Sequence, residues 1–179
     1  MAKRLSLSGL NLNFKEIADL FNIRKESLIF YYSSKNPNFN GIFVGYTKKE
    51  IEDELNYNLN EIEKDACLNL LASIEAIFRI DYAIRCERKR KETISRKFRE
   101  LFNEYQHRMP LEESLLETWK EHFPDKKHII SELKGAFKYR HWLAHGRYWE
   151  LKAERKDYDF FELYLLSLEL KNELPLLYI

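Results

Sequence analysis

The sequence is poor in the two residues that most often interrupt helices, because its 179 residues include only five Gly and four Pro. Its composition is not that of a disordered chain, which has few hydrophobic residues, because 45% of its residues are hydrophobic. These features exclude low-complexity and fibrous architectures. A length of 179 residues suits one compact domain.

The sequence also has only two cysteines, no long apolar run and almost no net charge. Cys67 and Cys86 form neither a CxxC pair nor a metal-binding framework, so we expect free thiols in a reducing compartment. No apolar run approaches the ~20 residues needed to span a bilayer. The formal net charge is only +1, so any binding of nucleic acid must come from a local patch. We therefore expect a soluble cytoplasmic protein with no membrane partner.

The apolar pattern predicts a mainly α-helical protein made of two parts. Residues 47–179 are expected to form a bundle of four to five helices, preceded by a small N-terminal extension over residues 1–46. In the extension, a short helical pattern over residues 14–21 is followed by two strand-favouring runs, 27–32 and 41–46. A loop rich in Ser, Asn and Pro separates these runs, so we predict a helix followed by a β-hairpin.

Caps and prolines mark the expected helix boundaries in the second part. Thr47 followed by Glu50 has the spacing of a capping box, which predicts the start of a helix. From there to about residue 108 there is no Gly or Pro, and the apolar spacing predicts two or three helices. Pro110 and Pro124 interrupt the pattern. Further helices are predicted over residues 111–123, 127–148 and 160–174.

The segment YRHWLAHGRY, residues 139–148, gathers two arginines and two histidines. Like charges at close spacing destabilise a helix, so a bound anion such as phosphate would relieve them. An arginine can hold phosphate oxygens bidentately, and a histidine can exchange a proton near neutral pH. Together they suit metal-free cleavage of a phosphodiester, with the 2′-hydroxyl of RNA as nucleophile. His141 and His145 share a helix face as a zinc pair would, but no third ligand is adjacent, so we predict neither metal nor cofactor.

The spacing of Arg140 and His145, with four residues between them, resembles the Arg-x(4 to 6)-His motif of the HEPN superfamily. The segment RHWLAHG, residues 140–146, also has the small residue before this histidine and the glycine after it that many members show. The resemblance implies a metal-independent endoribonuclease, often a toxin or phage-defence effector, in which a homodimer brings two motifs into one cleft. RNA would be the substrate, and an antitoxin or regulatory protein a further partner. Arg140 would stabilise the phosphoryl charge, His145 would act as general acid or base, and His141 would orient the substrate.

One departure concerns the residues after the motif histidine. Members controlled by a nucleotidyltransferase antitoxin carry tyrosine two positions after it, whereas this chain has Arg147 there and Tyr148 one further on. We therefore assign Arg147 and Tyr148 supporting roles and do not expect control by tyrosine modification.

Helix geometry independently favours two copies of the chain. At 3.6 residues per turn, Arg140 and His145 point about 140° apart, so either the helix is distorted near Gly146 or a symmetry mate completes the site. Two other interpretations stay open. The histidines could be partly buried, hydrogen-bonded structural residues beside Trp142 and Trp149. Alternatively, the chain could be a non-catalytic module that binds a nucleotide or an acidic protein and dimerises.

Asp81 and Glu75 are candidate supporting residues on a predicted helix. Asp81 falls within an apolar stripe, where an unpaired carboxylate would be very costly. We predict that one of these two carboxylates pairs with Arg140 or another motif residue and fixes its rotamer. The alternatives are an ordinary buried ion pair for Asp81 and an exposed pair with Arg79 for Glu75.

Although the net charge is close to zero, the sequence contains two runs of strong and opposite charge. Residues 85–99 hold eight Lys or Arg and two Glu, a local charge of +6, whereas residues 50–65 carry a local charge of −6. The basic run could follow an RNA backbone. The alternative is that the two runs are antiparallel neighbours that neutralise each other. The predicted RNA-binding residues are Arg88, Lys89, Arg90 and Lys91.

Overall fold

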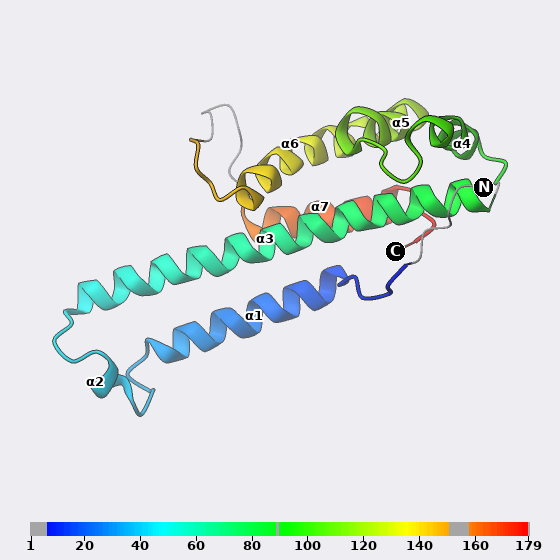
Figure 1. Ribbon diagram of the computed structural model, residues 1–179. Coiled ribbons are helices and arrows are strands. Elements are labelled where there is room, and N and C mark those ends of the chain that lie inside the picture. Colours follow the sequence, from blue (N-terminus) through cyan, green and yellow to red (C-terminus); the bar gives the residue numbers. More distant parts are fainter. Residues whose placement is uncertain (1–6, 89, 151–157, 179) are drawn as a thin grey trace.

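The protein is described by a computed structural model for residues 7–88, 90–150 and 158–178, and this part of the chain contains seven α-helices and no strand (Figure 1). The predicted mainly α class is therefore confirmed. A π-helical turn, Leu111–Leu115, and a 3-10 turn, Pro124–Lys126, flank the fifth helix. The helices are α1 Phe14–Tyr31, α2 Phe39–Ile42, α3 Lys48–Glu87, α4 Thr93–Tyr105, α5 Leu116–His122, α6 Lys127–Ala144 and α7 Phe160–Glu173.

The predicted β-hairpin of the N-terminal extension is wrong. A capping box formed by Asn13 and Glu16 starts α1, which continues through the first predicted strand to Tyr31. The second predicted strand is occupied by the end of α2 and a turn. The helix is anchored by one buried face in its first half, and no Gly or Pro ends it before Tyr31, so it extends through the strand-favouring residues. That buried face consists of Phe14, Ile17 and Phe21, which belong to the same core as residues of α3 and α7.

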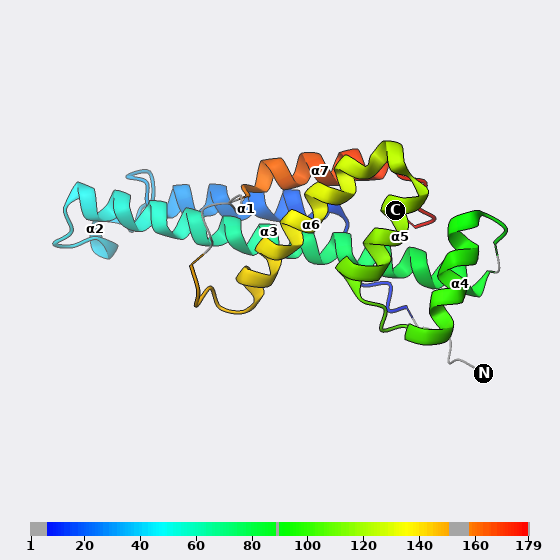
Figure 2. The same cartoon turned by 90° about the horizontal axis from the view of Figure 1, so that it is seen from above.

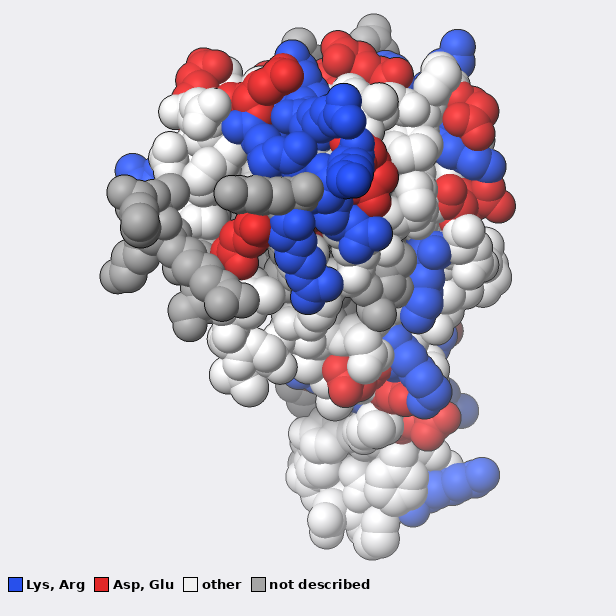
Figure 3. All heavy atoms as spheres, turned by 90° about the vertical axis from the view of Figure 1, so that its right-hand side faces the viewer, with Lys and Arg blue, Asp and Glu red and all other residues white. Residues whose placement is uncertain are grey.

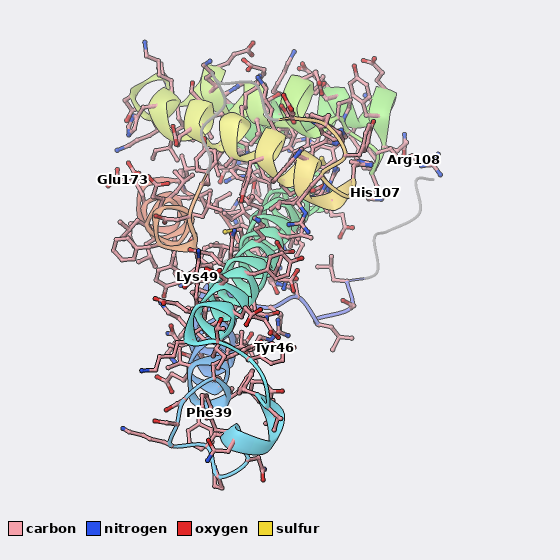
Figure 4. The ribbon with its side chains drawn as sticks, turned by 90° about the vertical axis from the view of Figure 1, so that its left-hand side faces the viewer. Phe39, Tyr46, Lys49, His107, Arg108 and Glu173 are labelled. Atoms are coloured by element: carbon pink, nitrogen blue, oxygen red, sulfur yellow. The ribbon has the colours of Figure 1, made fainter. Side chains whose placement is uncertain are left out.

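The long helix α3 is the axis of the molecule. It begins at the predicted capping box, in which the backbone N–H of Glu50 donates to Thr47 Oγ1 at 3.2 Å and the N–H of Thr47 donates to the Glu50 carboxylate at 2.7 Å. Its 40 residues extend about 60 Å at 1.5 Å per residue. The first part of α3 projects from the bundle together with α2 and the end of α1, with Phe39 and Tyr46 near the tip (Figure 4).

The other helices pack on opposite sides of α3. α1 lies along one side, and α4, α5 and α6 cover the other (Figure 1). α7 contacts α3, α6 and α1, and the view from above shows α6 and α7 beside α3 (Figure 2). Side chains with no solvent exposure join these elements: Leu70, Ile74 and Phe78 of α3, Trp119 of α5, Leu133 of α6, and Leu163 and Leu170 of α7.

Most predicted helix positions are confirmed, although several ends differ. The region expected to hold two or three helices holds two, α3 and α4. The helix predicted over residues 127–148 ends at Ala144, and the last helix ends at Glu173. No helix within the described residues is long and apolar enough to cross a membrane.

Candidate functional site

The helix α6 ends inside the motif. His145 is its C-cap, and the next two backbone N–H groups turn back onto the helix: Gly146 donates to Leu143 O at 3.4 Å and Arg147 donates to Trp142 O at 3.1 Å. This is the Schellman pattern, which requires a left-handed residue after the cap. Gly146 supplies it with φ +76°, a conformation that costs glycine little. The glycine thus ends α6 directly after the second histidine.

Arg140 turns from α6 towards α3. Its Nη2 lies 3.3 Å from Glu75 Oε2, while the other oxygen of Glu75 accepts a hydrogen bond from Arg79 Nε at 2.7 Å. Arg79 also donates to the backbone oxygen of Met109 at 3.2 Å. One carboxylate therefore holds two guanidinium groups. The sequence predicted that Glu75 or Asp81 would pair with a motif residue, and the structure pairs Glu75 with Arg140.

Asp81 belongs to a separate buried cluster. Its Oδ2 accepts from Arg85 Nε at 2.7 Å and its Oδ1 from the backbone N–H of Leu177 at 2.8 Å. Arg85 also donates to Ser95 Oγ at 3.2 Å and to the backbone oxygen of Pro175 at 2.6 Å. Burial raises the pKa of Asp81, and the charge of Arg85 opposes this shift. The pair joins α3 to α4 and to the C-terminal segment, as in the alternative of an ordinary buried ion pair.

His141 and His145 lie side by side at the exposed end of α6. Their ring centroids are 4.2 Å apart, and the Trp149 ring lies 5.8 Å from His141 and 6.5 Å from His145. Tyr148 packs edge-on against Trp149 at 4.6 Å. The indole Nε1 of Trp142 donates to the backbone oxygen of Trp149 at 2.7 Å, which holds this segment against α6. Both histidines are exposed, and both contact the Trp149 ring.

Arg147 is held by an ion pair with α3. Its Nη1 and Nη2 each donate to one oxygen of Glu61, both at 2.7 Å, and Lys64 also contacts Glu61 at 3.2 Å. The hydrogen bonds from Arg147 lower the pKa of Glu61 to about 2, and the same contact raises the pKa of Arg147. Sequence reasoning placed Glu61 only within an acidic run, because helical spacing does not tell which α3 residue meets the end of α6.

Within a single chain the motif does not form one compact site. Arg140 faces α3 and Glu75, whereas the histidines face solvent, in keeping with the divergence of about 140° expected along a helix. The described residues include no group of three or more His, Cys, Asp or Glu that could hold a metal ion. The chemistry available is therefore that of two exposed imidazoles beside an arginine anchored by a carboxylate.

The predicted RNA-binding residues lie at the junction of α3 and α4. Arg88 and Lys91 are exposed, Arg90 is partly buried and pairs with Glu92 at 2.8 Å, and Lys89 lies outside the described residues. Figure 3 views this end of the molecule and shows Lys and Arg side chains gathered in one patch with acidic side chains at its margins.

The acidic run of residues 50–65 lies in the N-terminal half of α3, whereas the basic run begins at its C-terminal end. Glu61 and Arg88 are separated by about 40 Å along the helix. The interpretation of the two runs as antiparallel neighbours is therefore wrong. Because Glu61 binds Arg147, the histidines lie towards the acidic half of α3 rather than beside the basic patch.

Comparisons of this chain with protein-family models, with curated proteins and with solved structures find no match. The site is therefore interpreted from its own residues. The sequence placed Trp149 beside the histidines in one of its interpretations, but the geometry of this contact depends on how the chain turns after Gly146.

Proposed function

We propose that this chain is a metal-independent endoribonuclease whose active centre is completed by a second copy of the chain. The observation that carries the proposal is the exposed pair of His141 and His145 on the helix whose Arg140 is held by Glu75. A solvent-facing imidazole can transfer protons to or from a substrate. A guanidinium can hold the oxygens of the reacting phosphate.

The proposed reaction is transesterification of single-stranded RNA. The 2′-oxygen attacks the adjacent phosphorus and the bond from phosphorus to the 5′-oxygen breaks, which leaves a 2′,3′-cyclic phosphate and a free 5′-hydroxyl. His145 accepts the proton of the 2′-hydroxyl and gives it to the leaving 5′-oxygen, so that no proton is gained or lost overall. Arg140 stabilises the negative charge on the phosphoryl oxygens, and His141 orients the substrate.

A homodimer is part of the proposal because the two motif residues diverge within one chain. A two-fold axis beside α6 would bring the histidine pair of one copy towards Arg140 of the other. The resemblance to the HEPN motif supports this arrangement. It also supports a toxin or phage-defence role in the cytoplasm, with an antitoxin or regulatory protein as a further partner.

The basic patch has a proposed role as a second contact for longer RNA. Arg88, Arg90 and Lys91 can neutralise backbone phosphates, and this kind of binding weakens steeply as salt concentration rises. Because the patch lies about 40 Å along α3 from Glu61, the residue that holds Arg147, a short oligonucleotide bound at the histidines would not reach it.

A second candidate function is a non-catalytic module that binds a nucleotide or a protein and dimerises. The observation that favours it is that both arginines of the segment 139–148 already have carboxylate partners: Arg140 pairs with Glu75, and Arg147 pairs with Glu61. A phosphate would have to compete with these carboxylates. Nucleotide binding without turnover would support this function.

The proposal is tested by cleavage of labelled single-stranded RNA in excess EDTA by the wild type, His145→Ala and Arg140→Ala, each checked for folding and oligomeric state. We expect wild-type cleavage to a 2′,3′-cyclic phosphate and a rate about 10²- to 10⁴-fold lower for His145→Ala, the range typical of a lost general acid or base. Arg140→Ala should also lose cleavage.

The matched control is His128→Ala, because His128 is an exposed histidine near the start of the same helix. Its contact with Glu169 at 3.2 Å lies on the surface, so this variant should cleave RNA like the wild type. Products with a 5′-phosphate, or full cleavage by His145→Ala, would contradict the proposed mechanism.

A further inference from the structure

The two histidines are part of a larger exposed surface of aromatic rings. His141 and His145 contact each other and the ring of Trp149, and Tyr148 continues the surface by packing against Trp149. The Tyr148 side chain is 83% exposed, so it contributes almost nothing to the hydrophobic core. A large ring held in solvent beside a group of other rings is available to a ligand.

Two sets of contacts hold this surface, one on each side of Tyr148. Before Tyr148, Arg147 is fixed by its two hydrogen bonds to Glu61. After it, the backbone of Trp149 is fixed by the indole N–H of Trp142. A surface that is ordered before binding loses less conformational entropy when a ligand arrives.

The exposed rings are connected to the protein core through Trp142 and Tyr139. Trp142 stacks on Tyr139 with ring centroids 5.8 Å apart and an interplanar angle of 24°. Tyr139 is 3% exposed and in turn contacts the buried Tyr158 at 5.9 Å. The rings at the surface therefore rest on a continuous series of aromatic contacts rather than on a free loop.

A positive charge lies on the same side of α6. Lys138 precedes His141 by three positions and His145 by seven, the spacing that places side chains on one helix face. It is exposed and forms no ion pair with any residue in the described part of the chain. The aromatic surface therefore has a cation beside it that can meet a phosphate.

We propose that His141, His145, Tyr148 and Trp149 form a stacking platform for an unpaired nucleobase of RNA, with Lys138 contacting the adjacent backbone phosphate. The inference rests on the proposed function, because it assigns the base-binding part of the same site. Stacking on aromatic rings recognises bases that are not already stacked in a duplex. The platform thus selects single-stranded RNA and places a phosphate next to His145.

Binding is measured separately from cleavage with a dye-labelled 2′-O-methyl oligoadenylate, which lacks the free 2′-hydroxyl needed for the reaction. In fluorescence anisotropy, we expect Tyr148→Ala of the full chain to weaken binding by between about 5-fold and about 150-fold, as for the loss of one base-stacking ring. Tyr148→Phe keeps the ring and should bind like the wild type. Tyr46→Ala is the matched control, because Tyr46 is 50% exposed and lies near the projecting tip of the molecule, away from α6 (Figure 4).

An abasic oligomer with the same backbone supplies the second comparison. Wild-type protein should bind it at least as weakly as Tyr148→Ala binds the oligoadenylate, and Tyr148→Ala should weaken the abasic complex no further. Equal binding of the two oligomers by the wild type would overturn the platform. So would unchanged binding by Tyr148→Ala, or a loss explained by a changed oligomeric state in light scattering.

The two proposals can fail separately. Base-dependent binding without cleavage of the corresponding ribo-oligomer would keep the platform and refute the nuclease. Cleavage that is unaffected by Tyr148→Ala, together with base-independent binding, would keep the nuclease and refute the platform.

Discussion

The residue Arg147 occupies a backbone conformation that its own side chain disfavours. Its φ is +58°, in the left-handed region that residues other than glycine seldom adopt. The bidentate contact with Glu61, with both distances at 2.7 Å, stabilises this conformation. Because Arg147 follows His145 by two positions, the ion pair also determines where the turn beside the histidines lies.

We expect Glu61→Gln to lower the free energy of unfolding at pH 7 by about 1 kcal/mol, which is about 2–4 °C in Tm for a chain of this size. In the folded protein the pKa of Glu61 is lowered from 4.5 to about 2. The carboxylate therefore contributes its full stabilisation above about pH 4.5, and this is lost as the pH falls towards 2. The difference in unfolding free energy between the wild type and Glu61→Gln should therefore shrink as the pH falls from about 4.5 towards 2. Thermal unfolding followed by circular dichroism measures this difference.

Glu52→Gln is the matched control for this prediction. Glu52 is exposed on the same helix and forms no ion pair within the described residues. Its substitution should change the free energy of unfolding by no more than about 0.5 kcal/mol. If the deficit of Glu61→Gln were the same at pH 3 as at pH 7, the lowered pKa would not be its cause.

At the scale of elements, α6 contains a glycine, Gly135, at the point where the segment before α7 packs against it. A Cβ at Gly135 would lie 2.6 Å from the hydroxyl oxygen of Tyr158, two residues before α7 begins. The Tyr158 hydroxyl donates to the backbone oxygen of Glu132 at 3.4 Å, and its ring is buried. Glycine within a helix costs about 0.5–1 kcal/mol relative to alanine, so the close approach of Tyr158 explains its presence here.

We expect Gly135→Ala to lower the free energy of unfolding by about 1–3 kcal/mol through overpacking, although alanine favours helices. Tyr158→Phe removes the oxygen that the new Cβ would meet. In that background, Gly135→Ala should be neutral or stabilising. A double-mutant cycle followed by urea denaturation measures the difference, and an equal loss of stability in both backgrounds would contradict the proposed contact.

At the scale of the whole molecule, the opposite charges of the two ends of α3 complement the dipole of this helix. The acidic run lies in its N-terminal half and the basic run begins at its C-terminus. The motif helix α6 crosses between them, with Arg140 at Glu75 and Arg147 at Glu61. The proposed active centre includes a second copy of the chain. Its composition is tested by mixing two variants rather than by substituting one residue in a single kind of chain.

We expect inactive Arg140→Ala and inactive His145→Ala chains to restore activity when they are mixed and allowed to exchange subunits. If each active centre combines Arg140 of one copy with His145 of the other, half of the dimers are mixed and each has one intact centre. The mixture should then reach about a quarter of the wild-type cleavage rate. Light scattering confirms that dimers form.

Each variant alone is the control for this experiment. No restored cleavage in a mixture shown to contain mixed dimers would mean that Arg140 and His145 of the same chain act together. The dimer would then have another role, and the active centre would need a local rearrangement of α6.

The sequence by itself determined the features that depend on neighbouring residues. The capping box of Thr47 and Glu50 started α3 where it was predicted, because a cap is satisfied within four residues. Apolar spacing likewise indicated the helical class and most helix positions. The pairing of Glu75 with Arg140 was one of the pairings predicted, whereas Asp81, for which burial was the argument, pairs with Arg85 four positions along the same helix.

Only the tertiary structure decided which distant residues meet. Residues 27–32 have strand-favouring side chains, yet α1 continues through them to Tyr31, because its first half is anchored by burial against α3 and α7 and no Gly or Pro ends the helix. Contacts such as Glu61 with Arg147 join positions 86 residues apart. They depend on how far α6 extends, where Gly146 turns the chain and how α6 crosses α3. These are properties of packed helices, which no local pattern encodes.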